Sequence, residues 1–392
     1  MMKLHTTDTN NSKNMAQNQP LILNIVTQME AGGAQKAALQ ICEKLMEKGF
    51  RSEVWFLYKK RPTYESLPYV WWICSNRPNK PGDIFRLLYT LRKWIIEAAP
   101  IAIITYTHYA NVIGQLVAWS VGIPYRLATQ RNPSWSYPLG ARWCDRLCGT
   151  LGIYTANIYV SESVKKSFAS YPLPYRRRSR VVVNGLAKPC PSVTKAEARQ
   201  KLGFPQEAVI IVNVGRLSYQ KNQEMLVKAI ARIPDNKVIL AIAGDGELRA
   251  QIHTLIARND LTHRVVLLGE LLPSQIPDFL VAGDIFAFPS RYEAFGFALV
   301  EAMMLGLPVL VSDIDAHREV VGDAGIFLPV DNIEAWTQAV ISLVEDPLLR
   351  TEMAARAQER AKAYDLDRMI DGYLRALFGE GPDALYSARR RS

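Results

Sequence analysis

Cysteine is scarce in this sequence, and the few cysteines present do not form a framework. The chain has five of them in 392 residues, and only Cys144 and Cys148 lie close together. An odd, widely spaced set argues against a disulfide-stapled fold and favours a reducing compartment. A structural zinc site is not indicated, because no second Cys or His pair stands at zinc-finger spacing.

Long apolar runs are also nearly absent. Residues 1–19 are polar and lack the apolar segment of a signal peptide, so we interpret them as a disordered leader. One stretch, residues 98–125, is long enough to span a membrane and carries no Asp, Glu, Lys or Arg. Prolines bracket it, and His108 and Asn111 interrupt it, so a buried strand followed by a helix is favoured over a span.

Acidic residues are few in the first half of the chain. Residues 1–187 hold 24 basic and 10 acidic side chains, whereas residues 188–392 hold 23 and 27. Seven of the eight Trp also lie in the first half. Aromatic rings beside cations suit an anionic membrane surface. Nucleic acid is the competing partner of a basic surface, but no nucleic-acid-binding motif accompanies this one, and we expect none to bind. The residues expected to contact headgroups are Trp71, Trp72, Arg86, Trp94, Arg142, Trp143 and Arg176-Arg177-Arg178.

Short apolar runs alternate with amphipathic segments almost from end to end. The expected strands of the first half are 21–26, 54–58, 101–105, 126–129, 158–160 and 180–183; those of the second are 209–214, 238–243, 265–268, 285–288, 309–311 and 325–328. Alternating strands and helices predict two doubly wound parallel sheets, with ligands in a cleft at the carboxyl ends of the strands. The expected parts are a first doubly wound domain (20–187), a proline-containing linker (185–194), a second doubly wound domain (195–365), and a C-terminal helix with a basic tail (366–392).

Three loops that follow expected strands carry candidate chemistry. Gly32-Gly33 opens a helix after the first strand, where the backbone can approach an anion. It lacks the G-x-G-x-x-G spacing of nicotinamide-binding folds, and a plain turn is the alternative. Arg216 and Lys221 follow strand 209–214 and can converge on a diphosphate. The alternative is that this segment is a solvated loop with no ligand.

The third loop places Glu293 and Glu301 at E-x7-E spacing around the start of a helix expected over 297–305. Carboxylates in an apolar segment need hydrogen-bond donors, and sugar hydroxyls are suitable ones. Backbone amides near Gly296 would face a phosphate. The alternatives are an N-terminal helix charge for Glu293 and an exposed helical carboxylate for Glu301.

These motifs, with Gly244-Asp245-Gly246, closely resemble those of the retaining glycosyltransferases of family four, which have the GT-B fold of two Rossmann-like domains facing a central cleft. The resemblance covers about residues 21–365, and it implies that the first domain (20–187) binds the acceptor and the second (195–365) binds the nucleotide sugar. It implies that Arg216 and Lys221 neutralise the donor diphosphate, that Glu301 binds the ribose, and that Glu293 binds the donor sugar.

The resemblance assigns the remaining contacts as well. Main-chain groups of Gly269 and Glu270 would contact the base. His108 would lie near the reacting centre and is the remaining catalytic candidate, beside Glu293, Arg216 and Lys221; a satisfied structural histidine is the alternative. Further donor contacts would come from Gly33, Gly215, Phe295, Gly296 and Phe297.

No metal or other cofactor is expected. Asp313-Ile314-Asp315 spells the D-x-D of metal-dependent glycosyltransferases, but those belong to a different fold. The sequence departs from the family at Asp315–Glu319, where a Gly-rich turn is usual, so His317 and Arg318 are candidates to touch an anionic acceptor.

The implied function is retaining transfer of a hexose from a nucleotide sugar to a lipid-linked, lipopolysaccharide or polysaccharide acceptor. We expect the nucleotide to be UDP, because UDP-sugars are common donors in the family that the sequence resembles. The expected location is the cytoplasmic face of the membrane, with peripheral attachment. A nucleotide-sugar epimerase, a glycan phosphorylase or another GT-B enzyme is the alternative, and a non-catalytic nucleotide-sugar-binding subunit is a third.

Overall fold

The structure, a computed structural model, describes residues 19–30 and 32–379 and divides into two compact units. Unit 1 contains the chain up to Asn184 together with the segment that begins at Leu366, and unit 2 is Gly185–Asp365. The first eighteen residues of the expected leader and the expected basic tail lie outside the described residues. The boundary therefore precedes the expected linker, which belongs to unit 2.

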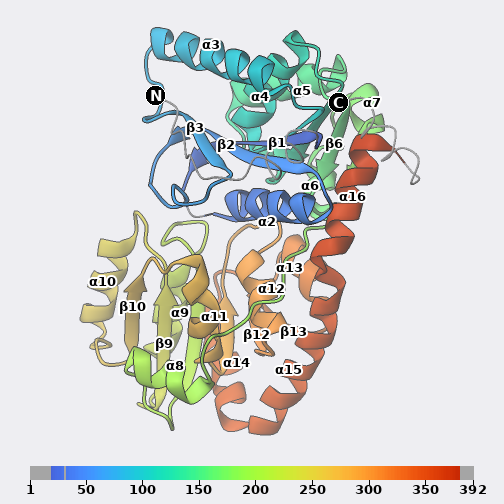
Figure 1. The fold of residues 1–392 in the computed structure, drawn as a ribbon. Helices are drawn as coiled ribbons and strands as arrows, with labels where there is room; N and C mark the ends of the chain where they lie inside the picture. Colours follow the sequence, from blue (N-terminus) through green and yellow to red (C-terminus); the bar gives the residue numbers. More distant parts are fainter. Residues whose placement is uncertain (1–18, 31, 380–392) are drawn as a thin grey trace. The chain divides into compact units, whose positions relative to one another are not determined.

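Unit 1 is built on a seven-stranded sheet in the order β3-β2-β1-β4-β5-β6-β7 (Figure 1). Every neighbouring pair of strands is parallel. The strands are β1 (Leu21–Met29), β2 (Arg51–Lys59), β3 (Val70–Cys74), β4 (Ala102–Tyr106), β5 (Tyr125–Gln130), β6 (Ala156–Tyr159) and β7 (Ser179–Val181). The central strands are almost wholly buried, which is why they read as continuous apolar runs and not as alternating ones.

Helices cover both faces of this sheet. One face packs against α2 (Gly33–Glu47) and α16 (Leu366–Phe378), and the other packs against α3 (Pro81–Ala98) and α4 (His108–Ser120). The unit also holds α5 (Leu139–Thr150), α6 (Glu162–Ser167), α7 (Leu173–Arg177) and the short η1 (Ser134–Ser136). Helix α16 returns to unit 1 from the end of the chain, where the ring of Phe378 stacks on that of Phe50 at 6.2 Å.

Unit 2 repeats the plan with a six-stranded sheet in the order β10-β9-β8-β11-β12-β13. Its strands are β8 (Val209–Val214), β9 (Val238–Ala243), β10 (Val265–Gly269), β11 (Ile285–Phe288), β12 (Val309–Ser312) and β13 (Gly325–Leu328), all parallel. Its helices are α8 (Lys195–Leu202), α9 (Gln223–Ile230), α10 (Arg249–Arg258), α11 (Ile276–Val281), α12 (Phe297–Met304), α13 (Asp315–Val321), α14 (Ile333–Glu345) and α15 (Pro347–Ala361), with the short η2 (Pro273–Gln275) and η3 (Lys362–Tyr364).

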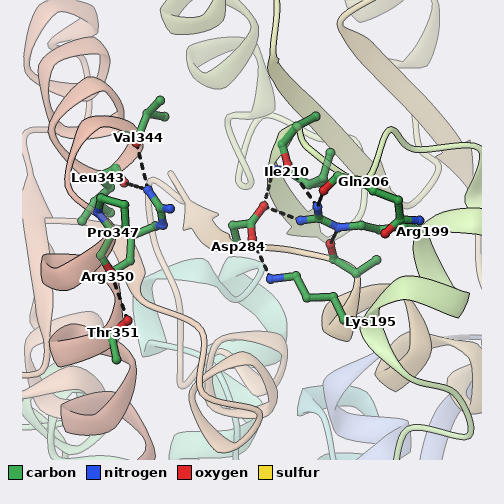
Figure 2. Close-up of polar contacts among 12 residues, drawn as sticks. Lys195, Arg199, Gln206, Ile210, Asp284, Leu343, Val344, Pro347, Arg350 and Thr351 are labelled. Carbon is green, nitrogen blue, oxygen red and sulfur yellow. Dashed lines mark hydrogen bonds and ion pairs between the residues drawn. The ribbon is translucent and has the colours of Figure 1, made fainter.

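A buried arginine fixes the start of this second sheet. The Arg199 guanidinium donates to the carbonyl oxygens of Gln206, Ala208 and Ala282 and forms an ion pair with Asp284 (Figure 2). Asp284 also accepts the amide of Ile210 at 2.7 Å, so one carboxylate joins α8 to β8 and to the segment before β11. Four hydrogen bonds from the guanidinium thus hold Arg199 in its buried position.

The expected strands of unit 2 coincide with the observed ones to within a residue. In unit 1, strand β3 was not predicted, and the expected bounds of β1, β2, β6 and β7 differ from the observed ones by more than one residue. No helix among the described residues is both long and apolar enough to cross a bilayer.

Candidate functional site

The candidate residues of unit 2 gather where its sheet changes winding direction. Strands β8 and β11 are neighbours, and the chain winds outward from β8 towards β10 and from β11 towards β13. Ligands of doubly wound sheets bind beyond the carboxyl ends of the strands at such a point. The loops in that position are 215–222 after β8 and 289–296 after β11.

These two loops are held together by their own polar groups. The Arg291 amide donates to the Gln220 carbonyl oxygen at 2.8 Å, and the Gln220 side chain donates to the Tyr292 carbonyl oxygen at 3.0 Å. Asn222, which adopts a left-handed backbone with φ of 53°, donates to the carbonyl oxygen of Pro289 at 3.3 Å. The pairing makes the two loops one structural element, so side chains on either are positioned relative to the other.

Lys221 and Glu293 form an ion pair across the two loops. Their side chains are 19% and 8% exposed, and the Lys221 ammonium also lies 4.6 Å from the centre of the Phe288 ring. The sequence suggested both residues as candidates, and the structure brings them into direct contact. In such a pair, the ammonium can bind a phosphate and the carboxylate can accept hydrogen bonds from hydroxyl groups.

Arg216 stands on the first loop but does not share this contact. Its guanidinium pairs with Glu247 at 3.1 Å, and the two side chains are 60% and 54% exposed. Arg216 and Lys221 therefore each pair with a carboxylate of their own, and their convergence on a diphosphate stays a prediction. An exposed ion pair is weak and exchanges partners at little cost.

Glycines bring three strand-end loops into backbone contact. A Cβ on Gly244, which has φ of 149°, would lie 2.0 Å from the carbonyl oxygen of Gly215. The Gly244 amide donates to the carbonyl oxygen of Gly269 at 2.7 Å, and Gly269 itself has φ of 75°. Glu270, the next residue, is exposed. The loops after β8, β9 and β10 thus form a continuous backbone surface, which includes the predicted Gly215 and Gly269.

Helix α12 begins directly after Gly296, another of the glycines predicted to contact the donor. Gly296 has φ of 93° and precedes the helix, and Leu299 and Val300 donate their amides to its carbonyl oxygen. The Phe295 ring is buried against Tyr364, whereas Phe297 is half-buried. Aromatic packing therefore fixes the chain at the start of the helix.

Glu301 lies inside α12 and is only 7% exposed. The interpretation of Glu301 as a solvated helical carboxylate is therefore wrong. A buried carboxylate needs hydrogen-bond donors or a cation, and the ribose-binding role of Glu301 stays a prediction.

His317 is wholly buried, contrary to the expectation that it could touch an acceptor. Its Nδ1 lies 2.8 Å from the Ser312 carbonyl oxygen, and its ring packs 5.4 Å from that of Phe288. Burial lowers the pKa of His317 to about 4, with the Glu293 carboxylate opposing that shift. A neutral imidazole therefore lies beneath the ion pair of Lys221 and Glu293.

Asp313, the first residue of the D-x-D triplet, pairs with an arginine of the same segment. Asp313 accepts two hydrogen bonds from the Arg318 guanidinium, at 2.5 and 2.7 Å, and Arg318 lies 5.2 Å from the Phe327 ring centre. Asp313 is thus committed to a bidentate pair. Among residues 19–30 and 32–379, no three Asp, Glu, His or Cys side chains gather as a metal site would require.

Unit 1 places its candidates at its own switch point, between β1 and β4. Gly33 is the exposed first residue of α2, after β1, and His108 is the first residue of α4, after β4. The preceding Thr107 has φ of 81°, a strained conformation for a β-branched residue, and its hydroxyl contacts that of Thr27 at 2.6 Å. No pattern in the sequence predicts this strain.

The His108 ring lies between two tyrosines, 4.2 Å from the Tyr109 ring and 4.9 Å from the Tyr137 ring. Burial lowers its pKa below the usual value for histidine, so the neutral form predominates at pH 7. Its buried Nε2 has no hydrogen-bond partner among the described residues. In the neutral ring this nitrogen can donate or accept one hydrogen bond, depending on the tautomer.

Part of the chain is similar to known glycosyltransferases. Residues 194–363 match the profile of the family described as Glycosyl transferases group 1. The phosphatidyl-myo-inositol mannosyltransferase of Mycolicibacterium smegmatis is 35% identical over 172 residues, which are 42% of this chain and 43% of that protein. The UDP-Gal:alpha-D-GlcNAc-diphosphoundecaprenol alpha-1,3-galactosyltransferase of Escherichia coli is 27% identical over 286 residues, 68% of this chain and 72% of that protein.

The fold has solved counterparts. The crystal structure of Alr3699/HepE from Anabaena in complex with UDP and glucose has a TM-score of 0.79 and 22% identity, covering 91% of this chain and 98% of that one. The expected GT-B fold class is confirmed by this likeness. The match to the mannosyltransferase spans less than half of that relative's length. The family profile covers the part of the chain that carries Arg216, Lys221, Glu293 and Glu301. Residues 194–363, less than half of the chain, thus resemble the glycosyl transferases group 1 family.

Proposed function

We propose that this protein is a retaining glycosyltransferase that moves a hexose from a nucleotide sugar to a lipid-linked or glycan acceptor. The observation that carries the proposal is the pairing of Lys221 with Glu293 at the switch point of unit 2, with buried Glu301 on the adjoining helix. Nucleotide-dependent relatives support the donor class, since the Escherichia coli relative is named for UDP-galactose.

In the proposed site, Lys221 and Arg216 carry the charge of the donor diphosphate. Each now pairs with a carboxylate, and the diphosphate would take over these cations when it binds. Negative charge grows on the leaving nucleoside diphosphate during transfer, so fixed cations there stabilise the transition state more than the ground state. Released from Lys221, Glu293 would accept hydrogen bonds from sugar hydroxyls, while Glu301 would accept them from the ribose.

Main-chain groups complete the proposed donor site. The glycine surface of Gly215 and Gly269, with Glu270, would face the nucleoside, and Phe295, Gly296 and Phe297 would offer amides to the phosphates. His108 would contact the reacting sugar or the acceptor through its unpartnered Nε2, and Gly33 would leave room for the phosphates.

Retention follows from substitution on one face of the sugar. The bond from the anomeric carbon to the phosphate oxygen breaks as the bond to the acceptor oxygen forms, and the acceptor proton passes to the leaving phosphate. No separate base is needed, and the charge is met by Arg216 and Lys221, so we propose no metal.

The acceptor class and location rest on the relatives and on the charge of unit 1. The names of both sequence relatives include a lipid, phosphatidylinositol or diphosphoundecaprenol. Nucleotide sugars and a low cysteine content fit a cytosolic setting. We place the reaction at the cytoplasmic face of a membrane, with peripheral attachment to anionic lipid and with no nucleic acid involved.

Calorimetric titration tests the donor site. Wild type, Lys221→Ala and the control Lys237→Ala would each be titrated with UDP-glucose, UDP-galactose and GDP-mannose. We expect one donor to bind and Lys221→Ala to weaken it at least tenfold, while Lys237→Ala, an exposed lysine of the same unit, has no effect. Equal binding by all three proteins would overturn the assignment. Conversion of the sugar without any acceptor would instead indicate an epimerase.

A further inference from the structure

The exposed apolar side chains of this protein are concentrated on one helical layer. Nineteen large hydrophobic side chains of the described chain are exposed, and thirteen of them fall between residues 84 and 151. They are Ile84, Phe85, Leu88, Tyr89, Ile96, Tyr109, Leu116, Trp119, Trp135, Leu139, Trp143, Leu147 and Leu151. Helices α3, α4 and α5 carry most of them and lie together in unit 1 (Figure 1). Exposed apolar area gathered in this way marks an interaction surface.

Helix α5 is the most regular part of this layer. Leu139, Trp143 and Leu147 on the helix and Leu151 just after it recur every four residues and are 58–67% exposed. Residues four apart share one helix face, so the four side chains form a stripe along α5. Its opposite side is buried through Asp145, Cys148 and Gly149, so the apolar stripe is not needed to hold α5 in unit 1.

A cavity of about 190 Å³ opens beside this stripe. Its lining residues are Ser134, Arg142, Trp143, Arg146, Ser170 and Tyr171. The Arg146 guanidinium lies between two rings, 5.5 Å from that of Trp143 and 5.7 Å from that of Tyr171. Stacking of this kind holds the planar cation in place and leaves its N–H groups for a ligand.

The charge of this cavity is not neutralised by unit 1. Within the described residues, neither Arg142 nor Arg146 forms an ion pair. Asp145, the acidic residue between them, is fully buried and accepts hydrogen bonds from Gln130, Tyr154 and Tyr175 instead. Two forked cations and the Ser170 hydroxyl in one cavity suit a phosphate group, whereas the Ser134 hydroxyl already donates to the Ser167 carbonyl oxygen.

The neighbouring helix adds further cations. Helix α7, which packs on α5, is followed at once by Arg178 and ends in Arg176 and Arg177, and all three are exposed. The apolar stripe is therefore bordered by positive charge. Apolar and aromatic side chains flanked by cations match the boundary between acyl chains and anionic headgroups.

We propose that this surface, formed by the outer stripe of α5 and the Arg142–Arg146 cavity, docks on an anionic phospholipid bilayer. A lipid phosphate enters the cavity while Leu139, Trp143, Leu147 and Leu151 enter the acyl boundary. A second copy of the chain fits less well, because a two-fold contact through this face would bring like charges together. The inference specifies the lipid surface of the proposed function but requires no donor site.

Vesicle flotation with the full chain tests the proposal. The vesicles are phosphatidylcholine alone and phosphatidylcholine with 30% phosphatidylglycerol, a composition chosen at about the anionic content of cytoplasmic leaflets. The variants are Arg142→Gln with Arg146→Gln, and Leu147→Gln. Matched controls on unit 2 are Arg356→Gln with Lys362→Gln, which removes two exposed cations, and Leu348→Gln, an exposed leucine.

Wild type is expected to float with the anionic vesicles only. Each arginine removed should lower the partition coefficient about fivefold, as for a cation at an anionic surface, and the double variant should lower it about twenty-fivefold. Leu147→Gln should lower it as well, and both controls should bind as wild type does. Arg142→Lys with Arg146→Lys should recover part of the binding, since charge is kept while the fork is lost.

Other results overturn the proposal. One is that the wild type does not bind anionic vesicles. Another is that the unit 2 controls lose as much vesicle binding as the unit 1 variants. A third is that the wild type sediments as a dimer and Leu147→Gln as a monomer. Binding of glycerol phosphate by calorimetry without vesicle flotation would also overturn it, by making the cavity a site for a soluble phosphate. Because no donor is present, failure here leaves the transferase proposal intact, and failure of donor binding leaves this result intact.

Discussion

The ammonium group of Lys221 is paired with the carboxylate of Glu293, on a loop 72 residues further along the chain. Both groups stand at the carboxyl ends of adjacent strands, so the parallel topology of β8 and β11 makes the contact possible. The pair has two consequences. It keeps two charges of the candidate site in place when no donor is bound, and it makes each charge costly to remove alone.

A double-mutant cycle measures that coupling. Lys221→Met should destabilise unit 2 by about 3 kcal/mol, because it leaves the Glu293 carboxylate, 8% exposed, without its cation. Adding Glu293→Gln should recover much of the lost free energy of unfolding, because it removes the unpaired charge. Urea unfolding of wild type, both single variants and the double variant gives the coupling energy. Additive losses would show that the pair contributes nothing to stability.

Gly244 is the second sensitive point of the site. In Gly244→Ala the new Cβ would lie 2.0 Å from the Gly215 carbonyl oxygen, and the φ of 149° is unfavourable for alanine. Relief requires the loop that carries Arg216 and Lys221 to move, so we expect a lower melting temperature and donor binding weakened at least tenfold.

The matched control is Gly82→Ala. A Cβ on Gly82, in the first turn of α3, meets nothing within 4 Å. Alanine is a better helix former than glycine, so this variant should melt at the same temperature or slightly higher. Equal effects of the two substitutions would mean that the close approach at Gly244 does not constrain the loop.

The fold could be predicted largely because its central strands are buried on both faces. Strands such as β8, β9 and β11 are continuous apolar runs, and their predicted bounds coincide with the observed ones. Strand β3 was missed, because Val70–Cys74 is dominated by two tryptophans that the sequence analysis assigned to a lipid surface. It is an edge strand, and its residues after Val70 are only half-buried.

The tertiary partners of single residues could not be predicted. Trp94 was assigned to headgroups, but its ring packs edge-on against that of Trp55 at 5.7 Å. Helix α16 was expected as a separate terminal element, yet it contributes nine buried residues to unit 1. Spacing in the sequence gives an amphipathic helix but not the surface that covers it.

The candidate site shows the same division. Its loops were located from glycines and charges that follow strands, because the carboxyl ends of parallel strands are the binding edge of such sheets. The pairing of Lys221 with Glu293 and of Arg216 with Glu247 depends on side-chain reach across loops. The burial of His317 had no signal, since a histidine in D-A-H-R-E reads as a polar turn residue.

Arg199 provides a test of what holds unit 2 together. Arg199→Met would leave three main-chain carbonyl oxygens without their donor and Asp284 without its buried cation (Figure 2). We expect a loss of about 3–5 kcal/mol in the free energy of unfolding. Urea unfolding measures it, with Arg350→Met as the comparison. That arginine caps α14 by donating to Leu343 and Val344 carbonyl oxygens without a buried acidic partner, so it should cost less.

His317 predicts a pH dependence of stability. Its pKa is lowered by burial to about 4, whereas the unfolded chain titrates near 6.5. Between these values the unfolded state binds more protons, so the stability that His317 contributes is present above about pH 6.5 and is lost as the pH falls towards 4. The loss amounts to about 3 kcal/mol. Asp145, whose pKa burial raises to about 6, acts in the opposite direction, so the variant must be compared with wild type at each pH.

Urea unfolding from pH 4 to pH 7.5 measures this effect. The free energy of unfolding should fall less steeply with falling pH for His317→Asn than for wild type. The control His253→Asn changes an exposed histidine of the same unit and should follow wild type. Parallel curves for wild type and His317→Asn would mean that the imidazole is protonated or solvated in the folded protein, and that it does not lie neutral beneath the ion pair of Lys221 and Glu293.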